Sequence, residues 1–87
     1  TIFNAIGCRV EVEKMIATGR IDMVVETIHI IYVLELKLSN NGGIDAAAEQ
    51  IRSRQYAEPF KADKRRVVAL AIELDDKGKG LIDWKEV

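Results

Sequence analysis

The sequence predicts a small α/β domain, a mixed β-sheet with a flanking helix, and three observations lead to this fold class. The chain has 87 residues, 48% of them hydrophobic and 31% charged, which suits one ordinary globular domain. Apolar segments of strand length precede and follow a single segment with helical periodicity. Residues rich in Gly, Asn and Asp separate these segments. The predicted order is β-β-β-α-β-β, in a single domain spanning residues 1–87.

The first half of the chain predicts three consecutive strands. Residues 8–15 alternate polar and apolar side chains, as a half-buried strand does. Residues 20–26 form a second predicted strand, and residues 30–38 a third that is apolar on both faces, which predicts a central strand covered on both sides. The connection between the second and third strands is too short for a crossover, so these two strands are predicted to form an antiparallel hairpin.

The second half predicts a helix and two further strands. Residues 44–56 carry apolar side chains at helical spacing, and Pro59 is expected to stop this helix. Residues 66–74 form an apolar strand that a helical crossover makes parallel to the third strand. Residues 81–87 are predicted to form an edge strand. Residues 1–7 resemble the end of a helix closed by glycine, which suggests a fragment of a longer, N-terminally truncated domain.

Three charged residues interrupt the apolar strands of the predicted hairpin. If the turn is centred between residues 28 and 29, residues whose numbers sum to 57 lie opposite one another, so Asp22 faces Glu35. Directly opposed Cβ atoms lie about 4.5 to 5.5 Å apart. Lys37 is two residues beyond Glu35 and shares its face. Because an unpaired buried charge costs several kcal/mol, these charges need a partner.

A bound divalent metal would explain the two carboxylates. Mg²⁺ prefers oxygen ligands, typically one or two carboxylates with water and phosphate, and Asp22, Glu35 and the Leu36 carbonyl could supply them. Such an ion would activate water for phosphodiester hydrolysis, with Lys37 orienting the nucleophile or neutralising charge. The alternative is structural: a cross-strand salt bridge between Asp22 and Lys37, with Glu35 solvated at a sheet edge.

Five short segments, in this order and spacing, resemble the PD-(D/E)XK nuclease superfamily. They are Gly19-Arg20-Ile21-Asp22-Met23-Val24, Tyr32-Val33-Leu34-Glu35-Leu36-Lys37, Ala47-Ala48-Glu49-Gln50-Ile51, Tyr56-Ala57-Glu58-Pro59-Phe60 and Asp83-Trp84-Lys85. More narrowly, the chain resembles the domain that follows an AAA-ATPase-like domain in bacterial proteins. The resemblance implies a restriction-endonuclease-like fold, a nucleic acid substrate, most naturally DNA, and an N-terminal AAA-ATPase-like partner domain.

The resemblance also implies roles for individual residues. Asp22 and Glu35 would be metal ligands for Mg²⁺ or Mn²⁺, Lys37 the catalytic lysine, and Gln50 a helix residue that supports the site. Tyr56 would join that network or pack on the core. The sequence departs from the family pattern at Ile21, which stands in place of the proline. A further acidic residue that many members carry ahead of the first strand would lie upstream of Thr1.

Basic residues give a candidate nucleic-acid surface although the net charge is only −1. Net charge near zero argues against binding driven by bulk charge. A local cluster could still hold a phosphate backbone, and ordinary solvated charges are the alternative. Arg20 could contact phosphate or pair with Glu26. The candidate residues are Arg20, Arg52, Arg54, Lys61, Lys64, Arg65 and Arg66.

Other features limit the function classes. The longest apolar runs are too short to cross a bilayer, and no targeting segment is visible, so a cytoplasmic location without membrane association is expected. The one cysteine, Cys8, cannot form an internal disulfide. A non-catalytic module that binds nucleic acid or protein is the rival to a nuclease. A homo-oligomer is a further possibility, with edge strands such as residues 81–87 pairing between copies.

Overall fold

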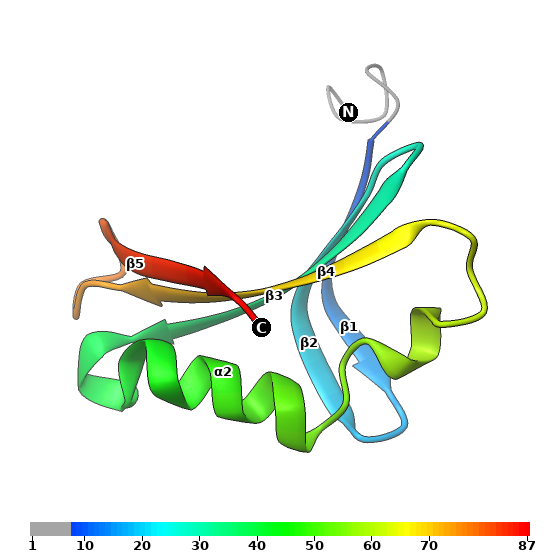
Figure 1. Cartoon of the computed structure of the whole chain (residues 1–87). Coiled ribbons are helices and arrows are strands. Elements are labelled where there is room, and N and C mark those ends of the chain that lie inside the picture. The colour runs from blue at the N-terminus through cyan, green and yellow to red at the C-terminus, as the bar shows by residue number, and fades with distance from the viewer. Residues whose placement is uncertain (1–7) are drawn as a thin grey trace.

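A computed structural model describes residues 8–87 as a five-stranded mixed sheet with one α-helix (Figure 1). The strands lie side by side in chain order, β1-β2-β3-β4-β5, and α2 packs on β3 and β4. The predicted sheet with one covering helix is therefore confirmed. The elements are β1 (Arg9–Ile16), β2 (Gly19–Glu26), β3 (Ile30–Leu38), α2 (Gly43–Ser53), β4 (Arg66–Leu74) and β5 (Leu81–Glu86), with short 3₁₀ helices at Ser39–Asn41 and Glu58–Phe60.

The β2–β3 hairpin has the register that the turn position predicts. Val24 lies opposite Val33 and Met23 opposite Leu34, and each pair sums to 57. The Thr27 hydroxyl accepts the Ile30 N–H at 2.9 Å and so fixes the turn. Beyond α2 the chain returns as β4, parallel to β3, as the crossover predicts. The two halves of the sheet thus meet at β3.

Three expectations about the elements need correction. The helix ends at Ser53 rather than at residue 56, and Pro59 lies in the following 3₁₀ helix, so it does not stop α2. Gln55, with φ of 52°, already reverses the chain. Strand β3 is fully buried on one face only, where α2 covers it, and its other face is partly exposed. The predicted helix end at residues 1–7 lies outside the described residues.

The core lies between α2 and the sheet. Ala47 and Ala48 are fully buried and let the helix backbone approach β3 and β4 closely, against Ile31, Val33 and Ala71. The start of α2 is held by Glu73 of β4, whose carboxylate accepts the Ile44 N–H at 2.9 Å. Gly43 has a φ of 59°, a left-handed conformation that favours glycine, and an added Cβ would lie 2.5 Å from this carboxylate. These contacts anchor the helix on the sheet beside β3.

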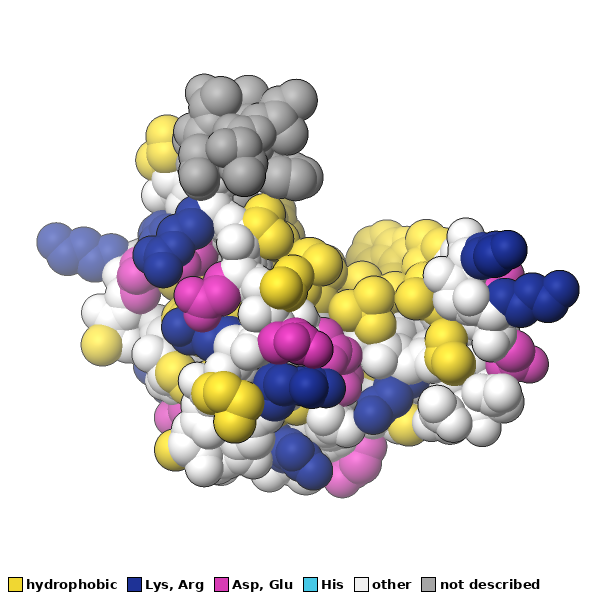
Figure 2. All heavy atoms as spheres, turned by 180° about the vertical axis from the view of Figure 1, so that it is seen from behind, with side chains coloured by type: hydrophobic (Ala, Val, Ile, Leu, Met, Phe, Trp, Pro, Cys, Tyr) yellow, Lys and Arg dark blue, Asp and Glu magenta, His cyan; other side chains and the backbone are white. Residues whose placement is uncertain are grey.

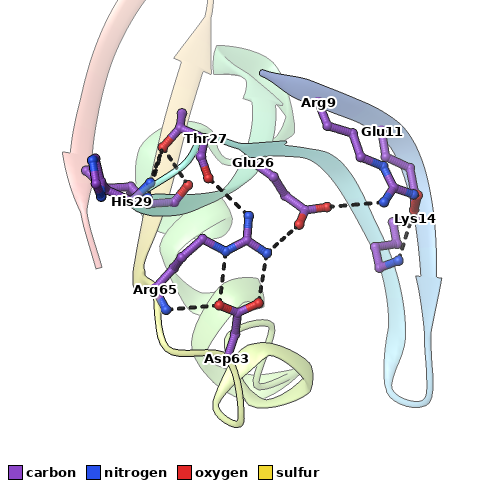
Figure 3. A network of polar contacts seen from close by, with 9 residues as sticks. Arg9, Glu11, Lys14, Glu26, Thr27, His29, Asp63 and Arg65 are labelled. Carbon is purple, nitrogen blue, oxygen red and sulfur yellow. Dashed lines mark hydrogen bonds and ion pairs between the residues drawn. The ribbon is translucent and has the colours of Figure 1, made fainter. Parts of the chain in front are cut away.

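One arginine of the loop before β4 binds the turn end of the β2–β3 hairpin (Figure 3). Arg65 donates to Asp63, to Glu26 at 2.7 Å and to the Thr27 carbonyl at 3.1 Å. Bonding to Arg65 lowers the pKa of Asp63 to about 2, and bonding to Asp63 and then Glu26 raises the pKa of Arg65.

Within residues 8–87, no helix is long and apolar enough to cross a membrane.

Candidate active site

The three central charges of the hairpin line one open cavity of about 570 Å³. Asp22 reaches it from β2, and Glu35, Leu36 and Lys37 reach it from consecutive positions of β3. The helix α2 and the turns that flank it close the other side. The remaining lining residues are Met15, Arg20, Leu38, Asn41, Gln50 and Arg54. All four residues predicted to act as metal ligands or catalytic lysine therefore share one cavity.

Glu35 is a fully buried carboxylate, only 2% exposed. Its Oε1 has no hydrogen-bond partner within the described part of the chain. Burial, followed by repulsion from Asp22, raises the pKa of Glu35 from 4.5 to about 7, and Lys37 partly opposes this. The alternative of a solvated Glu35 at a sheet edge is wrong, because β3 is central and the side chain is enclosed.

At Asp22 the pairing of β2 with β3 ends, and its pairing with β1 is interrupted for one residue. The ladder between β2 and β3 ends at Met23 and Leu34, and beyond it the Asp22 carboxylate accepts the Leu36 N–H at 2.9 Å. On the other side, the register with β1 places Glu13 opposite Asp22, and Glu13 has a left-handed φ of 54°. This break in the ladder frees the Asp22 side chain to lie beside Glu35 in the cavity.

Lys37 supplies a cation beside the buried carboxylate. Its Nζ is 3.7 Å from Glu35 Oε2, and its side chain is 29% exposed at the cavity. Lys37 therefore pairs with Glu35, whereas the structural alternative paired it with Asp22. One lysine does not neutralise two ionised carboxylates, so above the raised pKa of Glu35 the group carries a net negative charge that favours a further cation.

Gln50 connects α2 to the wall of the cavity through Tyr56. Its Nε2 donates to the Tyr56 hydroxyl at 2.8 Å, and that hydroxyl donates to the Arg20 carbonyl, also at 2.8 Å. Tyr56 is fully buried, and burial is the main cause that raises its pKa. The sequence left open whether Tyr56 joins the network or packs on the core, and in the structure it does both. This chain of bonds fixes the backbone two residues before Asp22.

Two arginines line the same cavity. Arg54 lies against Gly19, where an added Cβ would come within 2.7 Å of Arg54 Nη1, and its carbonyl accepts a hydrogen bond from the Thr18 hydroxyl. Glycine at position 19 thus makes room for this side chain. Arg20 pairs with Glu13 at 3.5 Å, not with Glu26 as one expectation had it. Both arginines are exposed at the cavity and can meet an anion there.

The structure does not bring the other basic candidates to the cavity. Arg65 is engaged in the network with Asp63 and Glu26, and Arg66 pairs with Glu86 at 3.5 Å. Arg66 is opposite Ile30, and Arg65 donates to the Thr27 carbonyl just before it, so both lie at the opposite end of β3 from Lys37. Arg52 and Lys61 border a second, smaller cavity, and Lys64 is exposed. The clustering of basic residues along the sequence therefore predicted a larger basic surface around the cavity than the structure has.

Sequence reasoning missed several residues of the cavity. Met15, Leu38 and Asn41 line it, from β1, β3 and the turn before α2. Asn41 falls in a segment that was expected only to separate the third strand from the helix, and this segment is a 3₁₀ turn leading into α2. The Gly42-Gly43 pair that follows adopts positive φ values and was the one local signal of a tight turn there.

The donor set suits a hard divalent cation bound by few protein ligands. Within the described residues, no three His, Cys, Asp or Glu side chains gather as a metal site does. Mg²⁺ needs only one or two carboxylates when water and substrate phosphate complete its octahedron. The unpartnered Oε1 of Glu35 is the atom such an ion would satisfy, and Asp22 and the Leu36 carbonyl are at hand.

The fold and the cavity define an α/β domain with an acidic pair and a lysine on adjacent central strands. A family model described as the PD-(D/E)XK nuclease superfamily matches residues 1–84, and the chain belongs to this superfamily. Nucleases of this superfamily typically use divalent metal ions. No curated protein matches the chain, and no solved structure does.

Proposed function

We propose that this domain is a nuclease that hydrolyses phosphodiester bonds of DNA with Mg²⁺ or Mn²⁺. The observation that carries the proposal is Glu35, a buried carboxylate with an unpartnered oxygen, held beside Asp22 and within 3.7 Å of Lys37. A domain that needed only stability would gain by replacing such a carboxylate with an apolar or amide side chain. Membership of a nuclease superfamily supports the same conclusion.

In this proposal each side chain has a separate task. Asp22, Glu35 and the Leu36 carbonyl would hold the cation. Such a cation would supply an activated water and charge stabilisation at the phosphate. Lys37 faces the same space and either orients that water or neutralises the developing negative charge. Gln50 acts through Tyr56 as a positioning residue for the β2 backbone.

The cavity supports a phosphate ligand rather than an uncharged one. Arg20 and Arg54 line it and are exposed, so they can contact the phosphate backbone of a bound nucleic acid. Arg52, Lys61 and Lys64 would add contacts farther away. Arg65 is committed to Asp63 and Glu26 and is left out of the proposed interface.

We further place the domain in a longer cytoplasmic protein, after an AAA-ATPase-like domain. The support is the sequence resemblance over Gly19–Val24, Tyr32–Lys37 and the segments that follow. An ATPase partner would give the nuclease an energy-dependent control. The resemblance, and no contact in the structure, is the basis of this placement.

A cleavage assay with matched substrates tests the proposal. The chain is incubated with supercoiled plasmid, a linear duplex, single-stranded DNA and RNA of the same sequence, with Mg²⁺, with Mn²⁺ and with chelator. We expect cleavage of DNA that depends on the metal and that Arg54→Ala slows. Arg66→Ala is the control and should leave the rate unchanged, because Arg66 is opposite Ile30, far along β3 from Lys37. Binding of nucleic acid without cleavage by any metal would favour the non-catalytic module instead.

A further inference from the structure

Strand β5 leaves an edge of the sheet open, and its exposed side chains are unusually apolar. Within residues 8–87 it pairs only with β4. Leu81, Ile82 and Trp84 are 61%, 57% and 59% exposed, and Figure 2 shows further hydrophobic side chains at the surface. Exposed, apolar edge strands are templates for pairing with another chain. The opposite edge differs, because Glu13 with its left-handed φ interrupts β1 in the middle.

The backbone direction of β5 limits how it could pair. In an antiparallel ladder, alternate residues direct both backbone groups toward the partner strand. The Val87 N–H donates to the Ala69 carbonyl at 2.8 Å, so Val87, Lys85 and Asp83 face β4. Trp84 therefore directs its N–H and C=O away from the sheet. Its N–H is instead 2.8 Å from Asp83 Oδ1, a bond within β5 itself.

We propose that two copies of this chain dimerise by antiparallel pairing of β5 with β5, with Trp84 on the two-fold axis. Only residues that face outward can form hydrogen-bonded pairs, so Trp84 must meet the partner's Trp84 or a residue two positions away. With Trp84 on the axis, residues whose numbers sum to 168 are opposite. Asp83 then faces the partner's Lys85, and the symmetry repeats this ion pair.

The neighbouring registers are disfavoured by charge. A sum of 166 places Asp83 opposite the partner's Asp83, and a sum of 170 places Lys85 opposite the partner's Lys85. Like charges in directly opposed positions are destabilising, whereas opposite charges contribute roughly 0.2 to 1 kcal/mol per pair. The strand Leu81–Glu86 is thus complementary to itself in one register. This charge complementarity, more than the exposure of the strand, indicates that the partner of the β5 edge is a second copy of the chain.

Side-chain directions agree with this arrangement. Lys85 is opposite Ala71 and is 3.6 Å from Asp45, so Asp83 and Lys85 lie on the face covered by α2. Trp84 is opposite Ile72, on the face that α2 leaves uncovered. Pairing would stack the two tryptophans there and form one continuous ten-stranded sheet. The Trp84 N–H would exchange Asp83 for a backbone carbonyl, which releases Asp83 to meet the partner's Lys85.

Sedimentation equilibrium measures the association. Chain concentrations up to about 1 mM allow a dimer with a dissociation constant of that order to be detected. We expect a monomer–dimer equilibrium that Asp83→Lys or Lys85→Asp weakens at least tenfold and that the double variant, with both charges exchanged, restores. Lys77→Glu, a charge reversal in the turn before β5, is the matched control and leaves association unchanged. Thermal unfolding of every variant confirms the fold.

Cross-linking tests the register directly. In a Cys8→Ser background, Trp84→Cys places two thiols on the axis, where opposed Cα atoms are about 5.5 Å apart and within disulfide reach. Glu86→Cys, which faces residue 82 of the partner, is expected to cross-link far more slowly. A monomer at every concentration, a double charge exchange that fails to restore association, or equal cross-linking at 84 and 86 would each overturn the proposal.

Discussion

Replacing Glu35 with glutamine is expected to stabilise the metal-free fold by about 3 kcal/mol at pH 8. Glu35 is 2% exposed, and burial followed by repulsion from Asp22 raises its pKa from 4.5 to about 7. At pH 8 the folded chain must hold this carboxylate ionised in an unfavourable environment, while the unfolded chain does not pay that cost. Glutamine has the same shape without the charge, and its amide can donate to Asp22.

The sign of the pH dependence follows from the raised pKa. Between pH 4.5 and about 7 the folded state keeps a proton on Glu35 that the unfolded state has lost. The free energy of unfolding therefore falls as the pH rises through this window and levels off above it. Glu35→Gln removes this contribution, so the difference between variant and parent grows from pH 4.5 to 7.

Urea unfolding of both proteins with chelator, from pH 4.5 to 8, measures this effect. Glu35→Gln is compared with Glu49→Gln, a matched change at an exposed position of α2. Parallel pH profiles of parent and Glu35→Gln would contradict the account, because they would mean that Glu35 ionises freely in the folded chain. A flat profile for Glu35→Gln, with the Glu49→Gln variant following the parent, is the expected result.

Replacing Lys37 with alanine is expected to slow DNA cleavage by about 100-fold or more, the loss typical of removing one charge-stabilising donor. In the proposed mechanism Lys37, whose Nζ lies 3.7 Å from Glu35 Oε2 in the cavity, acts on the reacting phosphate or its water and is not a metal ligand. Metal binding should therefore survive. Lys37 also lowers the pKa of Glu35, so the variant is expected to need a higher pH to bind metal.

Single-turnover cleavage rates at saturating Mg²⁺ separate these two effects. Lys79→Ala, at an exposed turn outside the cavity, is the matched control and should cleave at the parent rate. An unchanged rate for Lys37→Ala would remove the lysine from the chemistry and leave it as a structural partner of Glu35. If Lys37→Ala lost metal binding together with activity, the role of Lys37 would be to maintain the structure of the metal site, not to take part in the chemistry.

The sequence predicted best where one local rule decided the geometry. A short connection forces an antiparallel hairpin, and its centre sets the register, so Asp22 and Glu35 could be placed together from residue numbers. The helical crossover likewise fixed β4 parallel to β3. Both inferences depend on chain connectivity, which the sequence contains in full. The wider fold therefore followed from a few turns and periodicities.

Prediction failed where a distant partner or an unusual backbone decided the outcome. Gln55 ends the helical segment with a left-handed φ that glutamine rarely adopts, so no residue marked that end. Arg65 was assigned to a nucleic-acid surface because basic residues surround it, but Glu26, 39 positions earlier, holds it. The bend at Glu13 opposite Asp22 also leaves no trace in the alternating pattern of β1.

Calorimetric titration of Mn²⁺ into the chain at pH 6, in two buffers with different ionisation heats, tests the central claim that Asp22 and Glu35 hold a metal. At this pH Glu35, with a pKa of about 7, is mostly protonated, so binding should release most of one proton per ion. We predict one saturable site in the parent and its loss in Asp22→Ala. Equal, negligible binding in both proteins, or saturable binding without proton release, would contradict the account.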